Sequence, residues 1–221
     1  SGIFGAVVVS TDSEEYGALA VKHGADWHRR PVEYATDSSP DFEWINATMP
    51  HLKGHVPHPP EGYAAFAILR PTSPFRAAAN IRRAWAEFQA KGDRFDSLRA
   101  VDQKPKQHPW KMWLPAGEGM IPVFPDRTGA QPSHSVPTQL LRQVWPQNAS
   151  LEIAWAKTLE RWGSISGEHV LPFFTEGYEG YDLNTEDEWQ YAEWLVATGK
   201  ATLPELRKIA EVEEPVKIAV K

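Results

Sequence analysis

Residues 63–92 read YAAFAILRPTSPFRAAANIRRAWAEFQAKG and contain a strand followed directly by a helix. The first seven residues form an apolar run of the kind found in buried strands. Ser73 and Pro74 then predict a helix start, with Ser73 as the N-cap and Pro74 at the first helical position. Gly92 is expected to end this helix. The helix carries an apolar stripe at helical spacing, formed by Ile81, Trp85 and Phe88.

The start of the chain repeats this order of strand and helix. Residues 6–9 are the apolar, β-branched run AVVV, which predicts a strand. Asp12 and Glu15 have the spacing of a capping box, so a helix is expected to begin there. Gly24 is a typical residue for the end of that helix.

The rest of the chain continues the alternation of strands and helices. Further helices are expected at 41–49, before Pro50 stops the first of them, and at 185–199, where Thr185 and Glu188 have capping-box spacing. Further strands are expected at 97–103, 119–125, 150–155 and 169–174. This order predicts an α/β protein with a mostly parallel, doubly wound sheet. We expect one domain over 1–200, with an excursion at about 112–147 and a C-terminal extension at 201–221.

Composition and charge narrow the class of protein. The 221 residues include 23 basic and 29 acidic side chains, giving a formal charge of −6, so a general nucleic-acid binder is not expected. The absence of cysteine excludes disulfides and thiolate metal sites. No apolar run approaches the roughly 18 residues of a membrane span. The sequence therefore predicts a soluble, cytoplasmic protein with no membrane partner.

The segment from Arg70 to Arg76 lies where a strand is expected to meet a helix. Open α/β sheets bind ligands at the carboxyl ends of strands, and helix N-termini favour phosphate. The basic and hydroxyl side chains of this segment therefore suit an anionic ligand. A purely structural helix cap is the alternative interpretation, because Ser-Pro before a helix is common.

Two further segments carry groups suited to ligand binding. Residues 107–111, QHPWK, place a histidine and a lysine beside an aromatic ring, which suits an anion. A solvated loop is the alternative. Residues 177–184, GYEGYDLN, place acids and an amide before a helix, which suits Mg²⁺ held by one or two carboxylates and by substrate phosphates. A turn with a capping role is the alternative there.

Taken together, six segments resemble the acylneuraminate cytidylyltransferases, also called CMP-sialic acid synthetases. The resemblance covers Val7 to about Leu195, and it is the combined series that is specific. The segments are VVVSTDSEEYGALAVKHGA (7–25), RRPVEYATDSSP (29–40), LRPTSPFR (69–76), HPWKMW (108–113), QNASLEIAW (147–155) and YDLNTEDEW (181–189).

The resemblance implies a nucleotide-diphospho-sugar-transferase type of α/β fold that is usually dimeric, with the excursion contributing to the partner contact. It also implies a reaction in which CTP and an acidic nine-carbon keto sugar give a CMP-sugar and pyrophosphate with the help of Mg²⁺. The sugar hydroxyl attacks the α-phosphate in line, so catalysis depends on positioning and charge neutralisation.

The resemblance also implies roles for individual residues. Arg30 matches the arginine of the family's RP-x-x-LA motif, near the nucleotide. The other nucleotide-side residues are Asp37, Asp41, Arg70, Thr72 and Ser73. The sugar-side residues are Gln107, His108 and Asn148, and the catalytic candidates are Arg76, Lys111 and Asp182. Asp182 and Asn184 are the metal candidates.

The chain departs from the family pattern in two places. The family carries two aspartates as D-x-D near the metal, whereas here the second position is Asn184, so one negative charge is lost. The family also begins with a strand and a Gly-rich loop that wraps the triphosphate, and neither precedes the strand at 6–9. The family's first strand is central in its sheet. Without it, we expect the edges of its two neighbouring strands to be exposed. We expect chain exchange in a dimer or a loss of turnover, and a non-catalytic nucleotide- or sugar-binding protein is the alternative function.

Overall fold

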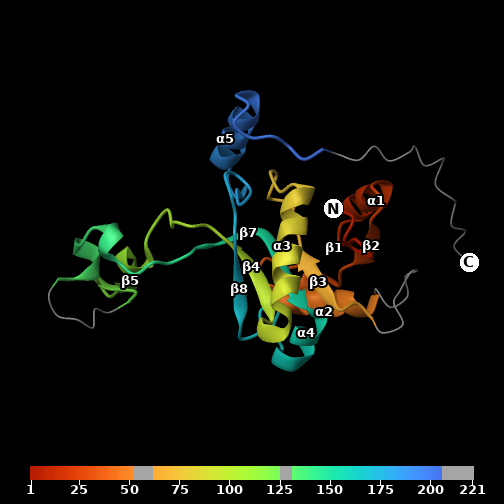
Figure 1. Cartoon of the computed structure of the whole chain (residues 1–221), viewed down its shortest axis with the longest axis horizontal. Helices are drawn as coiled ribbons and strands as arrows, with labels where there is room; N and C mark the ends of the chain where they lie inside the picture. The colour runs from red at the N-terminus through yellow and green to blue at the C-terminus, as the bar shows by residue number, and fades with distance from the viewer. Residues whose placement is uncertain (52–61, 125–130, 206–221) are drawn as a thin grey trace, which may run out of the picture.

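The computed structural model describes residues 1–51, 62–124 and 131–205, which alternate between strands and helices (Figure 1). The strands are β1 (Val8–Thr11), β2 (Asp26–Arg29), β3 (Ala65–Ile68), β4 (Ser97–Val101), β5 (Trp113–Ala116), β6 (Gly119–Pro122), β7 (Gln147–Trp155) and β8 (Val170–Phe174). The helices are α1 (Glu14–Lys22), α2 (Asp41–His51), α3 (Ala78–Lys91), α4 (Ala156–Trp162) and α5 (Glu186–Ala197). None of the helices in these ranges is long and apolar enough to cross a membrane.

The central sheet has four strands in the order β3-β7-β4-β8. Strand β4 pairs in parallel with β8, whereas β7 runs antiparallel to both β3 and β4. Strands β1 and β2 form a separate parallel pair, and β5 and β6 form an antiparallel hairpin. The predicted α/β class is confirmed, with a mixed sheet. A mostly parallel, doubly wound arrangement is not confirmed, because β7 supplies two antiparallel pairings.

The main core lies between α3 and the central sheet. Phe88 on α3 and Leu98 on β4 are completely buried, and Trp155 at the end of β7 stacks on Phe88 with ring centroids 4.7 Å apart. Ala84, Leu151 and Phe173 complete the centre of this cluster. The helical spacing of residues 81, 85 and 88 therefore predicted the buried face of α3 correctly.

Two predicted N-caps are wrong. The hydroxyl of Ser13, not Asp12, caps α1 by accepting the Tyr16 N–H at 3.3 Å. Helix α3 begins at Ala78 instead of Pro74, so Ser73 does not cap it. The side-chain oxygen of Asn80 instead accepts the backbone N–H of the N-cap residue, Ala77, at 2.6 Å. In each case a polar side chain further along the chain satisfies one of the free N–H groups at the helix start.

Proline also does not stop α2 where the sequence predicted. The helix runs through Pro50 to His51. Pro50 lies in the last turn, where its missing N–H removes only one helical hydrogen bond. The capping box of α5 is confirmed, because Thr185 and Glu188 exchange hydrogen bonds between side chain and backbone. Gly92 follows α3 with φ of 56°, as expected of its terminator.

The β5–β6 hairpin projects from the sheet as an arm, at the left in Figure 1. Its strands expose apolar side chains, including Leu114, Met120 and Ile121. Trp110 stacks on Phe124 at 4.7 Å inside the arm. The domain and excursion limits remain predictions, and the arm lies within the predicted excursion.

Strands β1 and β3 each have an edge without a neighbouring strand in the described residues, as do the outer strands β2 and β8. Strand β1 pairs only with β2, and β3 pairs only with β7. A mostly apolar cavity of about 320 Å³ lies between β1 and β3, and Val8 and Ala65 both line it. This arrangement agrees with the expectation of two exposed strand edges. The expected chain exchange remains a prediction.

Candidate active-site cleft

A polar cleft of about 820 Å³ lies at one end of the central sheet. Asp102 follows the carboxyl end of β4, Thr175 follows that of β8, and Asn148 lies near the start of the antiparallel β7. The antiparallel direction of β7 brings its first residues to the carboxyl ends of β4 and β8. Three segments that are far apart in sequence therefore form the floor of the cleft.

A hydrogen-bond network fixes the floor of the cleft. The Asn148 amide donates to Asp102 Oδ1 at 2.9 Å and to Thr175 Oγ1 at 3.0 Å. Thr175 Oγ1 also donates to Asp102 Oδ1 at 2.8 Å. The Asn148 carbonyl oxygen accepts from the Ser150 backbone and hydroxyl. Asn148 lines the cleft, and its polar groups hold these strands together; its predicted role in sugar binding stays a prediction.

Gly180 allows the following segment to lie against this floor. A Cβ at position 180 would be too close to the side chains of Asn148, Thr175 and Asp102. The absence of a side chain therefore lets residues 178–184 cross directly over the network. The Thr72 carbonyl accepts the Leu183 N–H at 2.9 Å, which fixes this segment from the other side.

Asp182 has one carboxylate oxygen that lacks a hydrogen-bond partner among the described residues. That oxygen, Oδ1, is buried, whereas Oδ2 accepts from the Asn184 amide at 2.9 Å. Glu188 accepts the backbone N–H groups of Asn184 and Thr185, and both Asp182 and Glu188 line the cleft. A buried carboxylate oxygen without a donor is costly unless a cation or a ligand group completes it.

Arg70 enters the cleft already paired with two acids. It donates to Asp41 and, at 3.3 Å, to Glu152, which is 4 % exposed. Burial raises the pKa of Asp41, but hydrogen bonds from Arg70 and Trp44 and nearby positive charge lower it overall. Asp41 therefore stays ionised, and its charge is used to orient Arg70.

Arg99 completes this buried network. It donates to Glu152 and, at 2.5 Å, to the Ser166 hydroxyl. Burial lowers the pKa of Arg99, and the charge of Asp41 raises it in part. One carboxylate, Glu152, thus pairs with two guanidinium groups across β7 and β4.

The balance of charge in the cleft is acidic. Its lining contains three basic and five acidic side chains. The basic ones are Arg70, Lys104 and Lys106, and the acidic ones are Asp102, Glu152, Glu176, Asp182 and Glu188. An isolated triphosphate would be repelled by much of this surface, so a divalent cation would favour its binding.

Several predicted site residues lie outside the cleft lining. Arg30 covers the ring of Trp44 at 4.6 Å and donates to the Ser10 carbonyl at 2.6 Å. Asp37 is exposed in the loop before α2. Arg76 donates to the Arg70 and Ser150 carbonyls, and burial lowers its pKa. In this structure Arg76 holds two segments together.

Ser73 and Thr72 do not line the cleft. Ser73 is buried, and its hydroxyl lacks a hydrogen-bond partner in the described part of the chain. The next aromatic residue, Phe75, packs against Leu195 of α5. The segment predicted to bind phosphate thus positions α5 and the residues that precede it.

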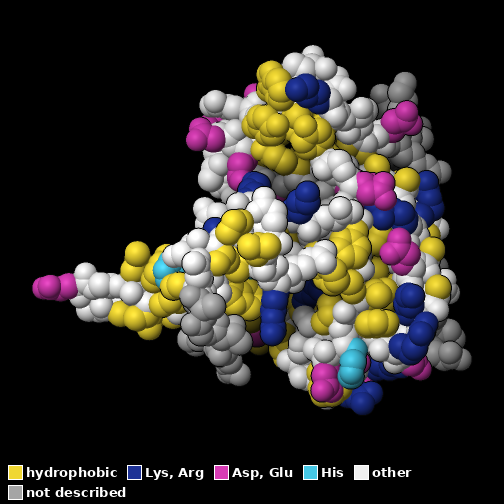
Figure 2. Space-filling model, turned by 60° about the vertical axis from the view of Figure 1, so that its left-hand side comes forward, with side chains coloured by type: hydrophobic (Ala, Val, Ile, Leu, Met, Phe, Trp, Pro, Cys, Tyr) yellow, Lys and Arg dark blue, Asp and Glu magenta, His cyan; other side chains and the backbone are white. Residues whose placement is uncertain are grey.

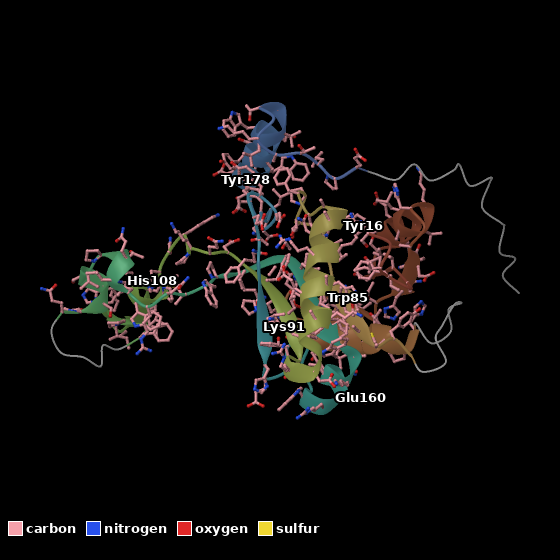
Figure 3. All side chains as sticks on the ribbon, in the orientation of Figure 1. Tyr16, Trp85, Lys91, His108, Glu160 and Tyr178 are labelled. Carbon is pink, nitrogen blue, oxygen red and sulfur yellow. The ribbon has the colours of Figure 1, made fainter. Side chains whose placement is uncertain are left out.

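The predicted sugar-side residues of the arm are separated from the cleft. His108 is buried in the arm, where its Nδ1 accepts from the Trp110 N–H and its Nε2 lies 3.0 Å from the Arg142 carbonyl. Figure 3 shows His108 far from Tyr178, which lines the cleft. Gln107 is exposed, and Lys111 belongs to the short helix Pro109–Lys111 of the arm. The structure therefore divides the predicted site between cleft and arm.

Sequence reasoning missed several residues of the cleft. Asp102, Lys104 and Lys106 follow β4, and Thr175 follows β8. A usable signal was present, because polar residues directly after a strand tend to reach the ligand edge of an α/β sheet. The role of Gly180 had no sequence signal, because it depends on contacts from distant segments.

Comparison with known proteins supports the resemblance found in the sequence. No protein-family model matches the chain. An N-acylneuraminate cytidylyltransferase of Escherichia coli O18:K1:H7 is 43 % identical over 89 residues, which are 40 % of this chain and 19 % of that protein. A CMP-N,N'-diacetyllegionaminic acid synthase of Legionella pneumophila is 25 % identical over 203 residues, which are 89 % of this chain and 80 % of that protein.

The resemblance to the acylneuraminate cytidylyltransferases is confirmed. The match to the cytidylyltransferase spans about a fifth of that relative's length, whereas the weaker match to the legionaminic acid synthase spans most of the chain. Both relatives are named for cytidylyl transfer to acidic sugars or for synthesis of the resulting CMP-sugar.

Proposed function

We propose that the chain is a cytidylyltransferase that joins CTP to a sialic-acid-like keto sugar, giving a CMP-sugar and pyrophosphate. The observation that carries this proposal is Asp182, whose buried oxygen has no partner in the described residues of a polar, substrate-sized cleft. The names of the two relatives indicate the same reaction class. The proposal includes a nucleotide-diphospho-sugar-transferase type of fold.

The chemistry requires a sugar hydroxyl to attack the α-phosphorus while pyrophosphate leaves from the opposite side. The protein must then hold the reactants in line and offset their negative charge. Arg70 and the lysines after β4 are the cations available in the cleft. The hydrogen bonds around Asn148 fix the floor of the cleft. A fixed floor keeps the two reactants in the orientation that the in-line attack requires.

Magnesium is part of the proposal, and the residues fit it. Asp182 provides a carboxylate oxygen, and Mg²⁺ usually binds to one or two carboxylates together with substrate phosphates. The described residues contain no cluster of three or more His, Cys, Asp or Glu side chains suited to a metal, so phosphate oxygens would complete the shell. When bound, the ion would neutralise phosphate charge. Asn184 would assist by holding the second Asp182 oxygen.

A homodimer and a cytoplasmic location also belong to the proposal. The arm carries Lys111 and His108 away from the cleft, and its hairpin strands expose apolar side chains. An exposed apolar hairpin favours contact with a second copy. Such contact would also explain why the predicted sugar-side residues lie on the arm.

Pyrophosphate release from CTP, Mg²⁺ and a panel of nine-carbon keto acids tests the proposed reaction. We expect Asp182→Asn to reduce the rate by at least about 100-fold, because it removes charge where phosphate must be neutralised. Glu186→Gln is the matched control, since Glu186 is exposed on α5 and does not line the cleft. Binding of Mn²⁺ in the presence of CTP, followed by electron paramagnetic resonance, should weaken in the Asp182 variant alone.

A non-catalytic nucleotide- or sugar-binding protein is the second candidate function. It is favoured by Arg70, whose charge is already matched by Asp41 and Glu152, and by the amide at Asn184. Calorimetric binding of the CMP-sugar without any pyrophosphate release would support this candidate. Release of pyrophosphate that Asp182→Asn leaves unchanged would contradict the assigned role of Asp182.

A further inference from the structure

Asp182 belongs to the segment 175–185, which connects β8 to α5 over the floor of the cleft. Figure 1 shows this segment beside the N-terminal end of α3. After Asp182, the segment is held by the hydrogen bond from the Leu183 N–H to the Thr72 carbonyl. Before Asp182, it is held by Glu179, whose side chain reaches α3. The position of Asp182 therefore depends on both attachments.

Three hydrogen-bond donors converge on the Glu179 carboxylate. The Asn80 amide donates to Oε1, and the Arg83 guanidinium donates to Oε2 at 2.6 Å. The Glu176 backbone N–H donates to the same Oε2 at 3.0 Å. Hydrogen bonds that involve an ionised group are roughly twice as strong as those between neutral groups. Both carboxylate oxygens of Glu179 thus attach the segment 175–185 to α3.

Helix α3 is a rigid support for this carboxylate. Asn80 is buried, and its side-chain oxygen accepts the Ala77 N–H at the start of the helix. Arg83 lies over the Phe173 ring of β8, 4.3 Å from the ring centroid. The same helix forms one side of the main core. Glu179 is therefore bound by side chains that are themselves held in place.

Glu179 is the principal acidic partner of Arg83 in the described part of the chain. Carboxylate oxygens of Glu87 and Glu176 lie 3.8 Å from Arg83 Nη1, and these two side chains are 45 % and 74 % exposed. The Glu179 side chain is 20 % exposed, and its Oε2 lies 2.6 Å from Arg83 Nη2. Because exposed ion pairs contribute little, the attachment to α3 depends mainly on Glu179.

We propose that Glu179 is a positioning residue, which holds Asp182 in place for a cation and phosphate by attaching the segment 175–185 to α3. This proposal rests on the proposed function, because it concerns the role assigned there to Asp182. Glu179 does not line the cleft, so it acts on the reactants through the segment that carries Asp182. Replacing a group that orients a metal ligand typically reduces metal affinity or activity by about 10–100-fold.

Amide exchange after Glu179→Gln tests the attachment. Donors face both oxygens of Glu179, so either orientation of the glutamine amide turns its NH₂ group toward a donor. We expect exchange at Leu183 to become at least about tenfold faster, because its hydrogen bond to Thr72 depends on the same segment. Leu98 in the central sheet is the internal reference. Unchanged exchange at Leu183, or equal acceleration at Leu98, would overturn the proposal.

Binding of Mn²⁺ in the presence of CTP, followed by electron paramagnetic resonance, tests the link between Glu179 and the cleft. Glu179→Gln should weaken this binding by about tenfold. Glu87→Gln is the matched control, because it removes the same charge beside Arg83 and leaves Glu179 in place. Equal weakening in the two variants would show an effect of charge alone and would contradict positioning.

The double variant Glu179→Gln/Asp182→Asn distinguishes positioning from a general structural loss. If Glu179 acts through Asp182, the double variant should release pyrophosphate within about twofold of the rate of Asp182→Asn alone. Losses that multiply would show that Glu179 acts independently of Asp182.

The single variants separate the two proposals. If Asp182→Asn leaves Mn²⁺ binding unchanged, the proposed function fails, and the role of Glu179 fails with it. If Asp182→Asn weakens the binding and Glu179→Gln does not, only the role of Glu179 fails.

Discussion

The four-stranded sheet and the unit formed by β1, α1 and β2 differ in how completely they bury their side chains. In the sheet, Phe88 and Leu98 are fully buried. In the β1–α1–β2 unit no strand residue except His28 is buried, and Leu19 on α1 is 52 % exposed. Tertiary packing therefore stabilises the sheet, whereas the β1–α1–β2 unit depends on a few specific contacts.

Those specific contacts are mostly polar. The Thr48 hydroxyl of α2 lies 3.1 Å from His28 Nδ1 and 3.2 Å from the Ser10 hydroxyl. Arg30 lies over the ring of Trp44, also on α2. Parts of one chain can therefore have very different local stabilities, which is common in proteins.

The apolar surface is also distributed unevenly. Figure 2 shows apolar side chains gathered over α5 at the top of the molecule, with Trp189, Tyr191 and Trp194 each more than 40 % exposed. The side of α5 that carries Leu195 is buried against Phe75. This helix is thus anchored on one side and apolar on the other.

Of the substitutions considered, truncation of the main core should change the free energy of unfolding most. Phe88→Ala removes a fully buried ring that stacks on Trp155, so we expect a loss of about 3–5 kcal/mol of unfolding free energy. Urea denaturation measures this loss. Leu19→Ala, at an exposed position of α1, is the control and should cost less than about 0.5 kcal/mol. Equal losses would remove the distinction between the regions.

A methyl group at Gly17 tests the packing inside the β1–α1–β2 unit. Its Cβ would overlap the Trp27 ring, whose Nε1 donates to the Thr11 carbonyl at 3.2 Å. We expect Gly17→Ala to cost about 1–3 kcal/mol locally, despite the better helix propensity of alanine. Faster amide exchange in β1 and β2, with β4 unchanged, would show this. A more stable α1 would contradict the expected overlap.

The hydrogen bonds of the Thr48 hydroxyl, which link α2 to β1 and β2, should contribute less to stability. Thr48→Val keeps the shape of the side chain but removes the hydroxyl that contacts His28 and Ser10. The expected cost is about 1 kcal/mol, measured by exchange in β1. Thr48→Ser retains the hydroxyl and is expected to preserve most of the protection. If both variants lose protection equally, packing of the methyl group is the cause.

The smallest expected effect is a dependence on pH. Burial lowers the pKa of His28, and the neighbouring His51 and Arg30 lower it further. The unfolded chain then binds a proton more readily than the folded one, so stability is full above the ordinary pKa of about 6.5 and falls as pH drops below it. Titration of His28 by nuclear magnetic resonance measures the shift. A pKa above the ordinary value would reverse the sign.

Much of the fold was predictable from local patterns. The strands at 97–101 and 170–174 and the helix from Glu186 agree with the sequence interpretation, because apolar runs and capping boxes act over a few residues. The start of α3 was predicted less well, since the helix begins at Ala78 and the Ala77 N–H is accepted by Asn80, with no cap from Ser73. Competition between nearby polar side chains cannot be settled by spacing alone.

The candidate site was predictable only in part. Arg70, Asn148 and Asp182 line the cleft, whereas His108 and Lys111 lie on the arm. Segment order suggested which residues belong to the site, but it did not predict the side of the fold on which each would lie. His108 and Lys111 lie away from the cleft because they belong to the arm. In the described structure the two strands of the arm pair only with each other and not with the central sheet.

Sequence patterns were sufficient to predict the α/β class, the apolar face of α3 and the resemblance to the cytidylyltransferases. Those properties follow from local periodicity and from the order of motifs along the chain. Three other features became visible only in the folded chain: β7 runs antiparallel, Gly180 lies against the Asn148 network, and β1 and β3 line one cavity. These features depend on contacts between distant segments, and no local pattern specifies such contacts.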